Sequence, residues 1–365
     1  MRVHGIVNRR GKSRPRRAGT PSTPAHPEPD ILRQGCHLLG FRHATASNRG
    51  KVLPMTQDRT EQFKFADAES YDTVNASFDK YARRFSAPLA RRMVALAALS
   101  PGHAVLDLGT GTGLAAMAAA AAVGDGGSVV GLDLSDGMLA IARAGAGDFG
   151  LTGRLRFVKG DAERPDFPDG SFDAVLALFS LLHLPHPDEA LRQMLRVLKP
   201  GGSLVIAVGS GPPLFSVPGF FHRVRRAVGL AREKLGKELR ATAFLDRLVE
   251  RALPTALDTE MPAWTGGRGV LPGGIPARIQ AVGFCDVREY WEGHISRLDT
   301  TEEFWELQAT YSSFARKRLA AAPPERLAAL RHEFDERCRA VLARGGRLVY
   351  PYGAAFYVAR RPSGQ

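Results

Sequence analysis

Five short apolar segments alternate with helix-forming segments or turns between residues 105 and 208, and this alternation is the strongest constraint on the fold. The predicted strands are all four to seven residues long: 105–108, 128–133, 155–159, 172–178 and 203–208. Helices are predicted between several of them, at 114–123, 136–144 and 187–198. Strands and helices that alternate at this spacing are typical of a doubly wound, mostly parallel α/β sheet. Ligands of such sheets bind beyond the carboxyl ends of the strands.

A long insertion separates these five strands from the rest of the sheet. About 75 residues lie between strand 203–208 and the next strand-like segment, 284–290, whereas ordinary connections have about 4–6 residues. Within the insertion we predict helices at 221–235 and 238–253 and a loop around Trp264. We interpret it as a helical lid over the carboxyl edge of the sheet. The arginines of its first helix are expected to form a solvated face.

The C-terminal part of the chain predicts two further strands, at 284–290 and 353–359, which bring the sheet to seven. Helices are predicted at 275–282, 301–320 and 325–342. We expect the aromatic side chains of this part to lie in the core rather than in a pocket; they are Trp291, Trp305, Tyr311 and Phe314.

These patterns predict five parts along the chain. They are a disordered basic tail (1–54), an N-terminal helical cap (55–100), a cofactor-binding core (101–210), a helical lid (211–280) and a C-terminal part that completes the sheet (281–365).

The tail accounts for most of the net charge of +13. It holds eleven Lys and Arg against two acidic residues, and its Arg, Pro, Ser and Thr cannot bury a core. Three interpretations stay open: a dispensable tail ahead of a working start at Met55, an arm that binds polyanions, or a targeting peptide.

The three cysteines are too widely separated to predict a disulfide framework or a metal cluster. Cys36, Cys285 and Cys338 fit buried or incidental thiols of a reducing compartment, so we expect a cytoplasmic protein. We expect no metal site. No apolar segment is long enough to predict a membrane-spanning helix.

A glycine loop follows the first predicted strand and precedes a helix, which is the context that a nucleotide-binding loop needs. Gly109, Gly111 and Gly113 would let the backbone approach a ligand closely. Asp133 closes the second strand, where a carboxylate can accept hydrogen bonds from both ribose hydroxyls. Sites for NAD and for S-adenosylmethionine (SAM) share these features, so they do not discriminate between the two ligands.

Two further features favour SAM. Asp107 lies two residues before the glycines, where a carboxylate would repel a pyrophosphate but suits a ligand with an ammonium and a sulfonium. Asp161 and Ala162 end the third strand, and they can hydrogen-bond the adenine edge through the carboxylate and the backbone N–H.

In this order, the motifs VLDLGTGTG, VVGLDLS, VKGDAERPDFPDGSFDAV and RVLKPGG resemble those of class I SAM-dependent methyltransferases. The resemblance is strongest to the branch that contains the ubiquinone/menaquinone C-methyltransferases, and it covers about residues 101–208. It implies a Rossmann-like methyltransferase fold that binds SAM. The residues that it implies in cofactor binding are Asp107, Gly109, Thr110, Gly111, Gly113, Asp133, Leu134, Asp161, Ala162, Phe179 and Ser180.

His183 is the candidate general base, because it lies just past the fourth strand, where the sulfonium methyl should point. The chain departs from the family pattern here. Relatives often carry His-His followed by Pro-Asp, whereas this chain keeps one histidine and places His186 where the acid would stand. Many methyl transfers need no base, so a structural role for His183 stays open.

The sequence thus predicts a methyltransferase that acts on a small, partly apolar acceptor. Nucleic acid is a disfavoured substrate, because no Asn/Asp-Pro-Pro-aromatic motif follows the fourth strand. An NAD(P)-dependent reductase with the same topology and an RNA-modifying methyltransferase that uses the basic tail remain alternatives. The identity of the acceptor and the oligomeric state stay open.

Overall fold

The computed structural model describes residues 57–210, 217–241, 244–253 and 274–364. The chain divides into two units, Met1–Leu53 and Pro54–Gln365, and the fold described below belongs to the second unit. The basic tail, the loop around Trp264, Cys36 and parts of the predicted lid lie outside the described residues. None of the helices in the described ranges combines the length and the apolar character needed to cross a bilayer.

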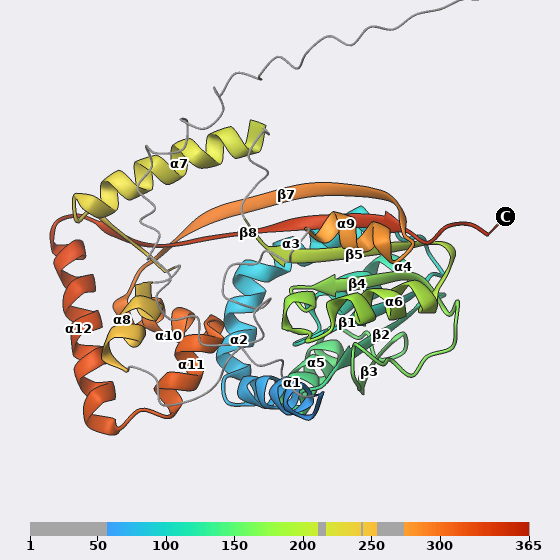
Figure 1. The fold of residues 1–365 in the computed structure, drawn as a ribbon, viewed down its shortest axis with the longest axis horizontal. Helices are drawn as coiled ribbons and strands as arrows, with labels where there is room; N and C mark the ends of the chain where they lie inside the picture. The colour runs from blue at the N-terminus through green and yellow to red at the C-terminus, as the bar shows by residue number, and fades with distance from the viewer. Residues whose placement is uncertain (1–56, 211–216, 242–243, 254–273, 365) are drawn as a thin grey trace, which may run out of the picture. The chain divides into compact units, whose positions relative to one another are not determined.

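One mixed sheet forms the centre of the unit (Figure 1). Its five parallel strands follow the order β3-β2-β1-β4-β5. Their bounds are β1 Ala104–Leu108, β2 Ser128–Asp133, β3 Leu155–Lys159, β4 Phe172–Leu178 and β5 Leu198–Gly209. The doubly wound, mostly parallel sheet predicted from the sequence is therefore confirmed. β5 begins before the predicted strand 203–208, because residues 198–202 also belong to it, and the register against β4 shifts in this segment.

Two layers of helices cover the sheet because successive strand residues point to opposite faces. In β1, Val105 packs with helices α3 (Ala87–Ala97), α4 (Leu114–Val123) and α5 (Asp136–Asp148), whereas Leu106 packs on the other face. That second face is covered by α6 (Pro187–Val197) and α9 (Ile275–Ala281), which contribute Leu191, Met194 and Ile279.

Three further strands extend the sheet beyond β5. β8 (Arg347–Arg360) pairs antiparallel with β5 and with β7 (Cys285–Leu298). β6 (Glu238–Arg240) pairs parallel with the start of β8. The sheet thus has eight strands within the described residues, not seven. The prediction of one helix over 238–253 is wrong at its start, since Glu238 lies in a strand and the helix, α8, is Phe244–Ala252.

A third apolar cluster joins the N-terminal helices to the C-terminal ones. Helix α2 (Asn75–Tyr81) and the π-helical turn η1 (Ala82–Ser86) contribute Tyr81 and Phe85. α8, α10 (Thr301–Tyr311), α11 (Ser313–Ala320) and α12 (Pro324–Ala343) supply most of the remainder, including Phe304 and Phe334. The single helix predicted over 301–320 is divided at Ser312, whose hydroxyl accepts a hydrogen bond from Ala315 N and caps α11.

Candidate cofactor and acceptor site

A cavity of about 1090 Å³ opens at the carboxyl ends of β1, β2 and β4. Its walls come from the loops after these strands, from the N-terminal helices, from the middle of β7, from the first half of β8 and from helix α7 (Val217–Lys234). Pockets for one small ligand usually have about 300–1,000 Å³. The volume of this cavity lies just above that range.

The glycine loop between β1 and α4 forms one wall. Gly109 and Gly111 line the cavity, and both have positive φ, +68° and +53°. A Cβ atom on Gly109 would lie 2.3 Å from Cβ of Ser180, whereas one on Gly111 would meet nothing within 4 Å. Gly113, with φ of +84°, begins α4 and packs against Phe157 rather than lining the cavity.

Asp107 lies beneath this loop and is almost completely buried. Its Oδ2 accepts hydrogen bonds from Thr110 Oγ1 at 2.7 Å and from Ala116 N at 3.0 Å, whereas its buried Oδ1 has no partner. Burial raises the pKa of Asp107 to about 7 despite these two hydrogen bonds. Asp107 thus has one carboxyl oxygen with hydrogen-bond partners and one without. A carboxyl group in this position fits a ligand that carries a positive charge on the cavity side of the glycine loop.

Asp133 ends β2 and lines the cavity. Its Oδ2 accepts from Gly111 N at 2.8 Å and its Oδ1 from Ser135 N at 3.0 Å. Burial raises the pKa of Asp133, although these backbone hydrogen bonds act in the opposite direction. Each carboxylate oxygen can accept a second hydrogen bond, so this arrangement fits a ribose with two hydroxyls.

The segment after β3 places Gly160 and Ala162 on the cavity wall, whereas Asp161, also predicted to bind the cofactor, does not line the cavity. Asp161 Oδ2 accepts from Lys64 Nζ at 2.6 Å, and its Oδ1 accepts from Glu163 N at 2.9 Å. Burial by itself would lower the pKa of the Lys64 ammonium. The surrounding carboxylates have the larger effect, so the pKa is raised. Asp161 is thus held by an ion pair that the sequence did not indicate.

The loop after β4 brings two more predicted residues, Phe179 and Ser180, to the cavity. Phe179 has φ of +61°, a conformation that non-glycine residues adopt at a cost, and it lines the cavity with Ser180. The Ser180 hydroxyl donates to Leu108 O at 2.7 Å and so ties the loop to β1. Thr110 and Leu134 also line the cavity.

His183 lies on the same loop and faces the cavity. Its Nδ1 is 3.2 Å from Oδ2 of Asp67, and its ring meets Tyr71 edge-on at 5.9 Å between centroids. Asp67 also accepts from Lys317 Nζ at 2.7 Å. Burial alone would raise the pKa of Asp67, but these two partners hold it well below the ordinary value. An ionised Asp67 keeps the proton of a neutral His183 on Nδ1 and leaves Nε2 as the acceptor.

His186 does not lie on the cavity wall. It precedes α6, and its backbone N–H donates to the Glu163 carboxylate. The histidine that stands where relatives have an acid is therefore outside the site described here.

Helix α1 (Gln57–Asp72) supplies residues that the sequence analysis missed. Lys64, Asp67, Ala68 and Tyr71 all line the cavity. Their spacing of three, four and seven residues places them on one face of the helix. That spacing could have indicated a helix face at the site. The segment has too few apolar residues, however, for the apolar periodicity that predicts a helix.

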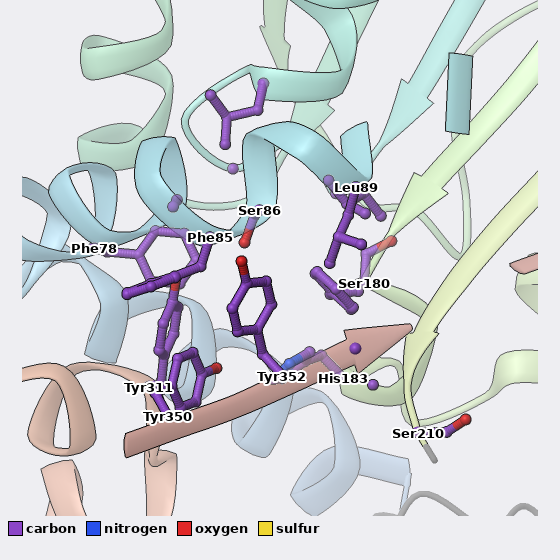
Figure 2. A pocket seen from close by; sticks show the side chains of 18 of the residues that line it. Phe78, Phe85, Ser86, Leu89, Ser180, His183, Ser210, Tyr311, Tyr350 and Tyr352 are labelled. Carbon is purple, nitrogen blue, oxygen red and sulfur yellow. The ribbon is translucent and has the colours of Figure 1, made fainter. Parts of the chain in front are cut away.

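An aromatic chamber forms the opposite wall; it consists of Phe78, Phe85, Tyr311, Tyr350 and Tyr352 (Figure 2). The rings of Tyr350 and Tyr352 stack at 5.4 Å, those of Tyr311 and Tyr350 at 5.9 Å. Phe85 meets Tyr350 and Tyr352 edge-on, at 5.1 Å each. Figure 2 shows His183 and Ser180 next to this chamber.

Of the four aromatic residues that were predicted to lie in the core, two lie there and two line the cavity. Trp305 and Phe314 pack against the third apolar cluster, as expected. Trp291 and Tyr311 line the cavity, so for them the expectation of a core position alone is wrong. Trp291 holds its place through a hydrogen bond from Nε1 to Ser210 O at 2.9 Å.

The described residues contain no group of three or more His, Cys, Asp or Glu side chains that could hold a metal ion. Cys285 and Cys338, the two cysteines with described positions, form no disulfide. What the cavity combines is a polar, glycine-lined end and an aromatic end, with a carboxylate-bound histidine at their junction.

Fold and site together resemble a class I methyltransferase core. Residues 105–202 match the family model of the methyltransferase domain, which confirms the resemblance predicted from the four motifs. Class I methyltransferases use SAM as their methyl donor. The match favours this class over the reductase that shares its topology.

The ubiquinone/menaquinone biosynthesis C-methyltransferases UbiE are among the similar curated proteins. The chain is 38% identical over 170 residues to UbiE of Ectopseudomonas mendocina (strain ymp), which covers 43% of this chain and 66% of that protein. It is 40% identical over 149 residues to UbiE of Pseudomonas putida (strain GB-1), covering 40% and 58%. The chain thus spans about two thirds or less of the length of these relatives.

Among solved structures, the YcgJ protein from Bacillus subtilis is similar with a TM-score of 0.46 and 18% identity. The similarity covers 75% of this chain and 98% of that one.

Proposed function

We propose that this protein is a cytoplasmic methyltransferase that moves a methyl group from SAM to a small, partly apolar acceptor. The observation that carries the proposal is the single cavity in which the glycine loop and Asp133 face an aromatic chamber. Donor and acceptor can bind there together, and holding two reactants in line supplies most of the rate of a displacement reaction.

The polar end of the cavity suits SAM. Asp133 would accept the ribose hydroxyls, and the carboxyl group of Asp107 would balance the positive charge of the ligand through the glycine loop. Ala162 N–H would meet the adenine edge, with Leu134 against the ring. When bound, SAM supplies an activated methyl group on a sulfonium.

The aromatic end suits a flat, partly apolar acceptor. Its five rings present apolar faces and phenol hydroxyls, which can stack on an aromatic ring and hydrogen-bond a substituent of it. The names of the UbiE relatives, which refer to ubiquinone and menaquinone biosynthesis, agree with an acceptor of this kind. The chamber would also exclude water from the reacting methyl group.

His183 would take the proton that the acceptor loses. Asp67 on its Nδ1 leaves Nε2 free to accept a proton from an acidic hydroxyl, or from a ring carbon that such a hydroxyl activates. Asp67 acts here as a positioning residue, since it holds the imidazole and fixes the tautomer.

The test of the proposal is a screen of phenolic and quinol-like acceptors with methyl-labelled SAM. Transfer of label to one of them, together with SAM binding by calorimetry, is the expected result. Binding of NAD(P)H and not of SAM would overturn the proposal. Label transferred to RNA instead of small molecules would support the alternative that uses the basic tail.

The role of His183 is tested with the acceptor found in that screen. His183→Ala should lower kcat by about 10²–10⁴ and leave the SAM affinity unchanged. Asp67→Asn should lower kcat less and alter its pH profile, because the imidazole loses its ionised partner. His186→Ala, outside the cavity, is the matched control. A decrease below about threefold for His183→Ala would assign this histidine a structural role.

A further inference from the structure

Helix α7 exposes a concentration of large apolar side chains to solvent. They are Phe220, Phe221, Val224, Val228 and Leu230, followed by Leu235 just past the helix end, and each is at least 45% exposed. Elsewhere in the described ranges, large exposed apolar residues are scattered singly, as at Phe65 and Phe149. Single exposed apolar residues are ordinary, but a contiguous group marks an interaction surface.

The contacts of α7 show which side of the helix faces the protein. His222 meets the ring of Trp291 at 5.5 Å between centroids, and Glu233 Oε1 lies 3.5 Å from Nη2 of Arg247. Gly229 lies against the guanidinium of Arg240. Residues 222, 229 and 233 share one face at the helical period, so this face is the inner one.

The outer face is apolar. Phe220, Val224 and Val228 follow one another at intervals of four residues, and Leu235 continues this row one helical repeat further on. None of these four lines the cavity. Figure 1 shows α7 as a helix at the edge of the unit, outside β7 and β8.

Basic side chains flank this apolar row on both sides. α7 carries five exposed basic residues, Arg223, Arg225, Arg226, Arg232 and Lys234, of which Arg225 and Arg226 also line the cavity. Its one acidic residue, Glu233, belongs to the inner face and lies near Arg247. The solvated basic face expected from the sequence is therefore only part of the pattern, because the arginines border an exposed apolar stripe.

We infer that α7 binds the surface of an anionic phospholipid bilayer. A helix with an apolar face between rows of Lys and Arg lies in the membrane interface, where the apolar residues enter the acyl boundary and the basic ones meet lipid phosphates. A second copy of α7 would bring like charges together, so charge complementarity favours an anionic surface as the occupant. The charges of α7 also exclude a spanning helix.

Because α7 forms part of the cavity wall, this orientation would place the cavity beside the bilayer. Phe221, Arg225 and Leu230 lie on α7 and also line the cavity. A partly apolar acceptor dissolved in the membrane could then enter beside the helix. This consequence rests on the proposed function, whereas membrane binding by α7 does not.

The experiment is flotation of the full chain with vesicles of phosphatidylcholine, alone or with about 30% phosphatidylglycerol. We expect the protein to float with the anionic vesicles and to be released by salt. The triple variant Phe220→Ser, Val224→Ser and Val228→Ser should lose at least about tenfold in binding. Phe149→Ser, at an exposed site outside α7, is the matched control and should bind like the original chain.

A second variant separates the charge from the apolar stripe. Arg232→Gln with Lys234→Gln should weaken binding to anionic vesicles and leave the melting temperature unchanged, since both side chains are exposed. Undiminished vesicle binding by the triple serine variant would overturn the inference and assign binding to another part of the chain, such as the basic tail. Failure to bind either vesicle would also overturn it. So would a dimer in light scattering that the serine variant dissolves, because α7 would then contact a second copy.

Discussion

Asp107 is a buried carboxyl group with one oxygen satisfied and the other not, and its protonation should control cofactor binding. The pKa of Asp107 is about 7 in the folded protein, so this carboxyl group keeps a proton that it would lose near pH 4 in an unfolded chain. The unfolding free energy that Asp107 contributes therefore falls as the pH rises between these two values. Ionisation of the same group favours a cationic ligand.

SAM affinity should accordingly rise by about tenfold between about pH 5.5 and pH 7. Calorimetric titrations across this range measure the change, and Asp107→Asn should abolish most of it. An equal pH dependence in Asp107→Asn would mean that Asp133, whose pKa is also raised, is the group that titrates.

Asp133→Ala should weaken SAM binding by about 1–3 kcal/mol, the free energy of hydrogen bonds to a charged group. Asp136→Ala is the control, because Asp136 is exposed, lies three residues away and pairs with Lys159. Equal SAM affinities of the original chain and Asp133→Ala, measured by calorimetry, would remove Asp133 from the cofactor site.

At the scale of elements, two glycines of the loop after β1 should differ in how much an alanine at their position destabilises the fold. Gly109 and Gly111 both have positive φ, but only Gly109 lies against another residue, Ser180. Gly111→Ala should cost about 1–2 kcal/mol in unfolding free energy, the strain of a left-handed alanine. Gly109→Ala should cost about 1–3 kcal/mol more, because its Cβ overlaps Ser180. Denaturant titrations measure both, and equal losses would contradict the geometry.

The elements that the sequence predicted well are those with a strong local pattern. The five parallel strands end within a residue or two of their predicted bounds, apart from β5, which begins earlier. The errors fall where a distant partner decides the structure. Residues 238–240 form a strand because the start of β8 offers them a free edge, and residues 301–320 bend at Ser312 because the chain packs against α8 and α12.

At the scale of the whole unit, helix α1, near the start of the described chain, meets helix α11, which lies about 250 positions later. Asp67 of α1 binds Lys317 of α11 at 2.7 Å, and Ser70 accepts from Arg316 at 2.9 Å. Arg316 also lies 4.3 Å from the ring centre of Tyr71. Helix α1 is therefore part of the site, and its first residue, Gln57, sets a limit to how far the N-terminus can be shortened.

A chain that begins at Met55 should keep the melting temperature and SAM affinity of the full chain, because residues 1–54 are too polar to bury a core. Calorimetry of both chains tests this. A chain that begins at Thr73 and so lacks α1 is the contrast, and it should lose SAM affinity together with Lys64 and Tyr71. A large decrease in melting temperature for the Met55 chain would show that the tail contributes to the fold.

The sequence by itself determined the parallel sheet and the polar end of the site. Strand periodicity is local, and parallel strands carry the residues at their carboxyl ends to one edge, so the glycine loop, Asp133 and Ala162 could be placed together in advance. Only the tertiary structure decided the partner of His183 and the aromatic chamber. Asp67 and His183 are 116 positions apart, and Asp67 and Lys317 are 250 apart. No local pattern encodes contacts of this kind, because they depend on how the N-terminal helices pack against α11 and against the residues at the start of β8.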